Sequence, residues 1–119
     1  MSPSLQYLES GYVVINRKVM SVLGPNEAIV IGELVNLINL GEDEEENIYF
    51  EGKYWIHKSY NDLQKEIFTY FSIRTLQRIF YKLEDIGILL KRYSDKNKFD
   101  RTLYTTIDFD KLNEVVFNK

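Results

Sequence analysis

The chain contains no cysteine and only one histidine, His57, among its 119 residues. Without cysteine, a disulfide framework, a thiolate metal site and a cysteine nucleophile are all excluded. One histidine does not supply the set of nitrogen ligands that a histidine-rich zinc site requires. We therefore expect no metal and no other cofactor. This residue usage also fits a protein of the cytoplasm, where disulfides are rare.

Long hydrophobic runs and targeting signals are also missing. The most apolar window, residues 28–40, is interrupted by a glycine, a glutamate and two asparagines. A membrane span needs roughly 18 consecutive apolar residues or more, and no stretch of this chain approaches that length. The N-terminus lacks the basic region and apolar core of a signal peptide. The window therefore predicts a buried helix of a globular domain, and we expect no membrane partner.

Residue groupings that carry catalysis are scarce. The six glycines are scattered, so none of them builds a phosphate-binding loop. His57 has no serine–base pair or carboxylate dyad near it in the sequence. The acidic run Glu42–Glu46 lacks the spaced ligands and internal glycine of a calcium loop. We expect no enzyme and no metal site; the run is expected to be a solvated loop.

What the chain does contain is enough apolar material for one folded domain. Hydrophobic residues make up 45% of the sequence and aromatic residues 14%, which argues against disorder. A length of 119 residues corresponds to a single domain with a real core. We therefore expect one α+β domain over residues 1–119, mainly helical.

The first half of the chain predicts two helices and a hairpin. Pro25 and Asn26 are start signals for a helix that Gly41 ends. Glu51, Gly52 and Lys53 form a turn signal between two β-rich runs. The expected elements, in order, are an extended segment or strand at Tyr12–Ile15, a short helix at Arg17–Leu23, a helix to Leu40, and strands at Ile48–Phe50 and Tyr54–Ile56.

The second half predicts a winged helix-turn-helix. Ser59 and Ser72 are N-cap candidates for two helices, and Gly87 is the stop signal of the second. The first helix is expected over Tyr60–Phe68. The full set of predicted parts is the helix-turn-helix at 59–87, the wing at 88–108 and a closing helix at 110–117; within the wing, strands at Ile88–Tyr93 and Arg101–Ile107 flank a tip at Ser94–Asp100.

The second helix is amphipathic, and its polar face predicts DNA contact. Its apolar positions recur at helical spacing: Ile73, Leu76, Ile79, Phe80, Leu83 and Ile86. The opposite face collects side chains that can contact phosphates and base edges: Arg74, Thr75, Gln77, Arg78, Tyr81 and Lys82. Lys82 is expected to hold a phosphate. A solvated helix face is the alternative interpretation of the same pattern.

The wing adds further positive charge. Lys96 and Lys98 at its tip, with Arg101 behind them, are candidates for phosphate or minor-groove contact. Lys91 and Arg92 are adjacent in a strand, so they cannot both face the same surface. Stacking of single-stranded bases is an alternative use of the exposed aromatic residues, for which Tyr81 and Tyr93 are candidates.

The net charge of −3 does not exclude a polyanionic partner, because the charges are unevenly distributed. Five carboxylates stand together in Glu42–Glu46, whereas residues 71–101 contain eight Lys or Arg and four Asp or Glu. Screening over roughly 8 to 10 Å lets the local surface dominate over a distant acidic run. A local balance of +4 is compatible with binding nucleic acid.

Three stretches resemble the N-terminal DNA-binding domain of replication initiator (replisome organiser) proteins from phages and plasmids of Gram-positive bacteria. They are GPNEAIVIGEL (Gly24–Leu34), YWIHKSYNDLQKEI (Tyr54–Ile67) and FDRTLYTTIDFDKL (Phe99–Leu112). The resemblance implies a winged-helix module that binds repeats in its own origin. Proteins of that kind usually carry a further C-terminal region that contacts helicase-loading machinery. The present sequence ends just after the domain, so it is either a fragment or a stand-alone module.

Three functions are compatible with these observations. The first is sequence-specific binding of double-stranded DNA in replication initiation of a mobile element. The second is transcriptional regulation in a phage or plasmid, with operators in place of origin repeats. The third is a protein-interaction module, in which the winged helix docks a host or replisome protein and binds no DNA. A homodimer is compatible with each, with the segment up to Leu23 as the expected pairing surface.

Overall fold

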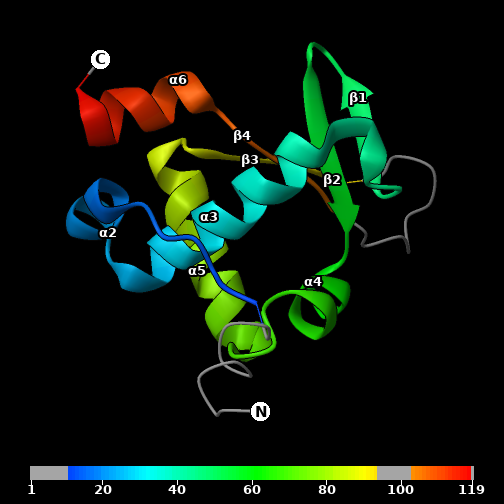
Figure 1. The fold of residues 1–119 in the computed structure, drawn as a ribbon, viewed down its shortest axis with the longest axis horizontal. Helices are drawn as coiled ribbons and strands as arrows, with labels where there is room; N and C mark the ends of the chain where they lie inside the picture. The colour runs from blue at the N-terminus through cyan, green and yellow to red at the C-terminus, as the bar shows by residue number, and fades with distance from the viewer. Residues whose placement is uncertain (1–10, 94–102, 119) are drawn as a thin grey trace, which may run out of the picture.

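The computed structural model describes residues 11–93 and 103–118, and these form an α+β fold (Figure 1). The main helices are α2 (Arg17–Leu23), α3 (Pro25–Leu40), α4 (Tyr60–Glu66), α5 (Ile73–Ile86) and α6 (Phe109–Leu112). The strands are β1 (Asn47–Phe50), β2 (Lys53–Lys58), β3 (Leu89–Tyr93) and β4 (Leu103–Ile107). No helix in the described ranges is both long and apolar enough to cross a membrane.

The N-terminal segment is extended and lies on helix α3. Residues 11–16, which we call the strap, form no strand, so of the two expectations for this segment the extended one is confirmed. The side chain of Asn16 caps α2 by accepting a hydrogen bond from the Val19 amide at 3.0 Å. The strap crosses α3 at Gly32, where an added Cβ would collide with the Val14 carbonyl oxygen. A side chain at position 32 would therefore push the strap off the helix.

The four strands form one antiparallel sheet in the order β1-β2-β4-β3. Both hairpins were expected, but their union through β2 and β4 was not. Ile56 lies opposite Thr105, and His57 lies opposite Tyr104. This pairing joins segments almost fifty residues apart, and the alternation of side chains along each strand says nothing about which strands are neighbours.

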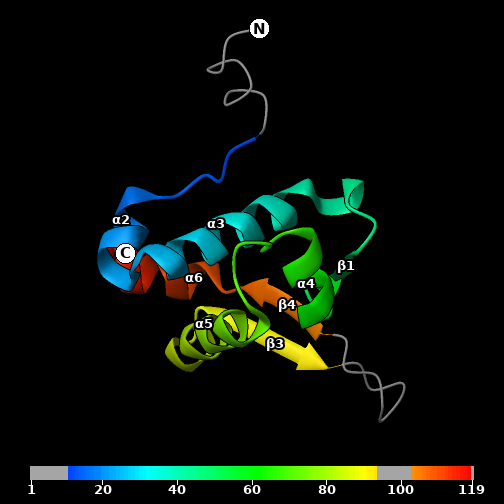
Figure 2. The same ribbon diagram turned by 90° about the horizontal axis from the view of Figure 1, so that it is seen from below.

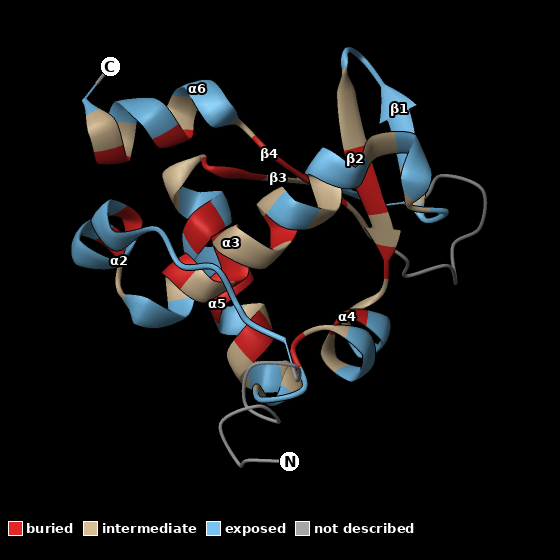
Figure 3. Cartoon of the chain, viewed as in Figure 1, coloured by how far each residue is buried: buried red, intermediate tan, exposed pale blue. Residues whose placement is uncertain are grey.

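The hydrophobic core lies between the helices and one face of the sheet. Helices α3, α4 and α5 all contact strands of the sheet, and Figure 2 shows α3 running above β4 while α5 lies beside β3. Figure 3 shows that the buried residues gather where these elements meet. Among the largest fully buried side chains are Leu34, Ile56, Phe68, Phe80 and Leu83.

The predicted caps set the ends of α4 and α5. The Ser59 and Ser72 hydroxyls each accept a hydrogen bond, from the amides of Asp62 and Thr75 respectively, both at 3.1 Å. Gly87 ends α5 in the left-handed conformation, with φ of 97°.

Two helix boundaries differ from the predicted ones. Helix α4 ends at Glu66, two residues earlier than expected, because Phe68 turns into the core and is fully buried. The closing helix begins at Phe109, one residue earlier than expected, where the side chain of Asp108 caps it. It continues as wider π-type turns, η2 (Asn113–Phe117). The tip of the predicted wing, Ser94–Asp100, and the first residues of its second strand lie outside the described residues.

Candidate nucleic-acid interface

Packing of α5 against the core sets the direction of its polar face. Leu76, Ile79, Phe80 and Leu83 are all buried, as their spacing predicted. Side chains on the other side of the helix must point away from the core. Arg74, Arg78 and Tyr81 are accordingly exposed, and Gln77 is half-buried between them. These four positions are three, four and seven residues apart and therefore form one stripe along the helix.

The charge on this stripe is concentrated at the start of the helix. Arg74 and Arg78 are one turn apart, and among the described residues no ion pair involves either guanidinium. The helix N-terminus adds a partial positive charge at the same end. Glu84 and Asp85 are exposed near the other end. An anionic ligand would therefore be held at the first two turns of α5.

Thr75 has a local structural role. Its hydroxyl oxygen accepts a hydrogen bond from the Ser72 hydroxyl at 3.0 Å, while the Thr75 amide donates to the same serine. The side chain is half-buried in this cap. The structure thus places Thr75 beside the stripe, with its hydroxyl already engaged.

Lys82 lies apart from the stripe, contrary to the expectation that the polar positions of α5 project together. Its ammonium group donates to the Leu23 carbonyl at 3.1 Å and lies 3.6 Å from the Glu27 carboxylate. These partners belong to the end of α2 and the start of α3. Lys82 therefore ties α5 to the N-terminal helices, and a phosphate would have to compete with Glu27 for it.

A buried ammonium group joins α5 to strand β3. Lys91 Nζ lies 2.8 Å from the Glu84 carboxylate and 3.3 Å from the Tyr60 hydroxyl, and 5% of its side chain is exposed. It also lies 4.6 Å from the centre of the Tyr81 ring, a cation–π distance. Burial alone would lower the pKa of Lys91, but the hydrogen bonds and charges of Glu84 and Tyr60 outweigh it and raise that pKa.

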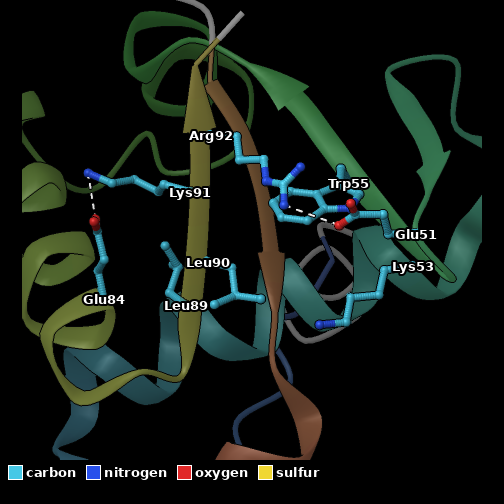
Figure 4. A pocket seen from close by; sticks show the side chains of 8 residues that line it. All are labelled: Glu51, Lys53, Trp55, Glu84, Leu89, Leu90, Lys91 and Arg92. Atoms are coloured by element: carbon cyan, nitrogen blue, oxygen red, sulfur yellow. Dashed lines mark hydrogen bonds and ion pairs between the residues drawn. The ribbon is translucent and has the colours of Figure 1, made fainter.

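Arg92 points to the other face of the sheet, as strand alternation predicted. Its guanidinium carbon lies 5.3 Å from the ring centres of both Phe50 and Trp55, and it donates to the Glu51 carboxylate at 3.1 Å. Figure 4 shows Lys91 and Arg92 extending from β3 in opposite directions. The Arg92 side borders an open cavity of about 310 Å³ that Lys53 also lines. Arg92 thus links β3 to the turn of the β1–β2 hairpin.

Of two further parts of the expected interface, the structure describes the tyrosines but not the cations of the wing. Lys96, Lys98 and Arg101 lie outside the described residues, so the wing contribution stays a prediction. Tyr81 and Tyr93 are well exposed, at 64% and 55%. Tyr93 ends β3, whereas Tyr81 belongs to the α5 stripe.

The sequence did not predict the contacts that Lys91 and Arg92 make. Each cation has a partner that is far from it in the chain: Tyr60 precedes Lys91 by 31 residues, and Glu51 precedes Arg92 by 41. Strand alternation indicated that the two cations face opposite ways, but no spacing rule indicated which residues meet them.

The chain matches no protein-family model, no curated protein and no solved structure.

Proposed function

We propose that this chain is a winged-helix domain that binds double-stranded DNA through helix α5. The observation that carries the proposal is a stripe on the side of α5 that faces away from the core, while the other side of the helix is buried. The stripe consists of Arg74, Gln77, Arg78 and Tyr81. A helix fits the major groove, where an arginine can bind guanine and a glutamine can bind adenine with two hydrogen bonds each. Residues near the start of the helix usually make these contacts.

The arrangement of the neighbouring elements supports this assignment. Helix α4, a short turn, helix α5 and the antiparallel pair β3–β4 follow one another in the order of a winged helix-turn-helix. The Lys91–Glu84 ion pair joins β3 to α5. In the proposed complex this pair holds the wing at a constant angle to the recognition helix, while Lys96, Lys98 and Arg101 contact the DNA backbone.

The biological setting follows from the resemblance of the three stretches quoted above. It favours replication initiation of a phage or plasmid, with origin repeats as the DNA and helicase-loading proteins as further partners. A homodimer would match repeated half-sites. Operators near a promoter are the alternative DNA, and the geometry of α5 is equally suited to them.

Selection from a randomised duplex pool, followed by fluorescence anisotropy, tests the proposal. At about 150 mM salt the selected duplex should bind more tightly than a scrambled one. The preference should be about 10³-fold or more, the usual margin of specific over non-specific binding. Arg78→Ala should weaken binding by about 1 to 3 kcal/mol if the guanidinium contacts a base. Equal affinity for selected and scrambled duplexes would refute sequence-specific recognition.

Lys18→Ala is the matched control. Lys18 is an exposed cation on α2, outside the α5 stripe, so its removal subtracts the same charge from the molecule. If both variants weaken binding equally, net charge rather than the stripe governs affinity. The salt dependence separates the two cases further, because a lost phosphate contact reduces the slope of log K against log salt by about one.

A further inference from the structure

Strand β1 leaves one edge of the sheet open. It is the terminal strand in the order β1-β2-β4-β3, and no described strand pairs with its outer side. Ile48, Tyr49 and Phe50 are exposed by 40%, 63% and 47%. Lysine, proline, a bulge or a very short strand protects many exposed edges; β1 (NIYF) contains neither residue type, and only its length of four residues limits the open edge. Its register with β2 is continuous, without a bulge.

The backbone of β1 offers hydrogen-bonding groups at this edge. The His57 amide donates to the Glu46 carbonyl at 2.9 Å, so residue 46 faces β2. Backbone groups alternate along an antiparallel pair, so residues 48 and 50 also face β2 and residues 47 and 49 face away. The Asn47 amide is engaged by the Glu44 carbonyl at 3.0 Å. The amide and carbonyl of Tyr49 and the carbonyl of Asn47 therefore remain directed outward.

The strand is held in position without an outer partner. The Asn47 side-chain amide donates to the carbonyls of Leu37 and Gly41, at 2.8 and 3.1 Å, which fixes one end of β1 to the end of α3. At the other end, the Trp55 indole donates to the Phe50 carbonyl at 3.1 Å. A preorganised strand loses little conformational freedom when a further strand adds to it.

Negative charge accumulates beside the Asn47 end of this edge. The acidic run Glu42–Glu46 leads directly into β1, partly as the single 3-10 turn η1 (Gly41–Asp43). None of the ion pairs between described residues involves these five carboxylates. Asp43 and Glu45 are exposed and lie within a few residues of Asn47. The charge therefore favours a cationic group at that end.

We propose that β1 binds an extended segment of a partner protein, which adds to the sheet antiparallel to β1 as a fifth strand. Main-chain hydrogen bonds to Tyr49 and Asn47 would give affinity, as in other cases of strand addition. Lysine or arginine residues following the partner strand would lie beside the acidic run, because the C-terminal end of an antiparallel strand meets the Asn47 end of β1. The partner is thus an extended apolar segment with a basic C-terminal flank.

Two other occupants fit this edge less well. In a symmetric pairing of two copies around Ile48, Glu45 of each copy would lie opposite Glu51 of the other, and like charges across strands are destabilising. Pairing around Tyr49 would place Glu45 opposite Lys53 instead, a single cation against the five carboxylates of Glu42–Glu46. Nucleic acid would meet like-charge repulsion from the acidic run. The β1 edge lies at the opposite side of the sheet from β3, which contacts α5. The two proposed surfaces are therefore separate, and either proposal can fail without the other.

The test uses the full chain and a labelled nine-residue peptide of alternating threonine and valine that ends in three lysines. Its matched control peptide ends in three glutamates. Anisotropy should show binding of the lysine peptide, and hydrogen exchange should slow at the Tyr49 amide. Binding of both peptides with equal affinity, or of neither, would overturn the proposal.

Two variants of Tyr49 separate backbone pairing from side-chain contact. Tyr49→Pro removes an amide that faces away from β2, so the β1–β2 hydrogen bonds are kept, as is usual for proline on edge strands. It should weaken peptide binding at least tenfold. Tyr49→Ala keeps the amide and should weaken binding far less. Equal losses in both variants would assign the effect to the tyrosine ring and contradict strand addition.

A charge variant keeps the proposal testable if the proline variant fails to fold. Asp43→Asn combined with Glu45→Gln should weaken binding of the lysine peptide about tenfold at low salt, and should reduce its salt dependence. Unchanged binding would overturn the role of the acidic run. Sedimentation completes the test: self-association that Tyr49→Pro abolishes would assign the edge to a second copy and refute the partner proposed here.

Discussion

The ammonium group of Lys91 lies 2.8 Å from the Glu84 carboxylate, and this ion pair connects strand β3 to helix α5. Its two members differ in exposure: 5% of the Lys91 side chain is accessible, against 42% for Glu84. The carboxylate can therefore be solvated without its partner, whereas the ammonium group cannot. Loss of the Glu84 carboxylate should therefore lower the free energy of unfolding by more than an exposed ion pair usually contributes to it.

Glu84→Gln should lower the free energy of unfolding by about 1 to 3 kcal/mol, the usual cost of weakening a buried hydrogen bond to a charge. The charged amine of Lys91 would keep the Tyr60 hydroxyl and the neutral amide oxygen of the introduced glutamine as acceptors, but it would lose its carboxylate. Urea denaturation measures the change. Asp85→Asn is the control, because it removes an adjacent exposed charge and should stay within about 0.5 kcal/mol. Equal effects of the two variants would contradict the importance of the pair.

The same cluster predicts a loss of stability at alkaline pH. Burial raises the pKa of Tyr60, and the partners of Lys91 raise the pKa of its ammonium group despite burial. For both groups the folded state holds its proton more tightly than the unfolded chain. Their contribution is therefore complete below the unfolded pKa values, about 10 for tyrosine and 10.4 for lysine, and is lost as the pH rises above them.

Denaturation at several pH values between 8 and 11 checks this. We expect a constant free energy of unfolding up to about pH 9.5 from this cluster, followed by a decline. Lys91→Met removes one of the two linked protons and also the ammonium group that lowers the pKa of Tyr60, so in this variant the decline from the cluster comes from Tyr60 alone. A free energy of unfolding that rises over this pH range in the unmodified protein would show that the sign of the linkage is wrong.

Gly32→Ala should detach the strap from α3. Alanine is favoured over glycine inside a helix by about 1 kcal/mol. An added methyl group would, however, collide with the Val14 carbonyl, and such overpacking costs about 1 to 3 kcal/mol. We expect faster amide exchange in residues 12–15 with α3 intact. Asn36→Ala, at an exposed position of the same helix, should leave exchange in the strap unchanged.

Glu51→Asn should be neutral or stabilising by about 0.5 kcal/mol. Glu51 has a φ of 53°, a left-handed conformation that asparagine tolerates better than glutamate. The change removes the pair with Arg92, but both side chains are more than half exposed, and such pairs contribute about 0 to 1 kcal/mol. Glu51→Gln loses the charge and keeps the strain, so thermal unfolding should rank it below Glu51→Asn. The reverse order would contradict strain at position 51, and an equal loss of stability in both variants would show that the ion pair outweighs the strain.

Local structure could be predicted closely from the residues. Serine caps at 59 and 72, the stop at Gly87 and the burial of Leu76 and Phe80 all follow from interactions within one or two turns. Of the candidate site, the direction of Arg74, Arg78 and Tyr81 follows from the same periodicity. The end of α4 was misplaced because burial of Phe68, a tertiary contact, ends the helix at Glu66.

The amino-acid sequence by itself determined the caps, the turn of the β1–β2 hairpin and the two faces of α5, because the residues responsible lie within a few positions of one another. Only the tertiary structure decided that β2 pairs with β4, that Lys82 reaches the Leu23 carbonyl 59 residues away, and that Arg92 meets Glu51. Helical and strand periods specify which way a side chain points. The identity of the group that it meets depends on how distant elements pack, and this depends on the whole core at once.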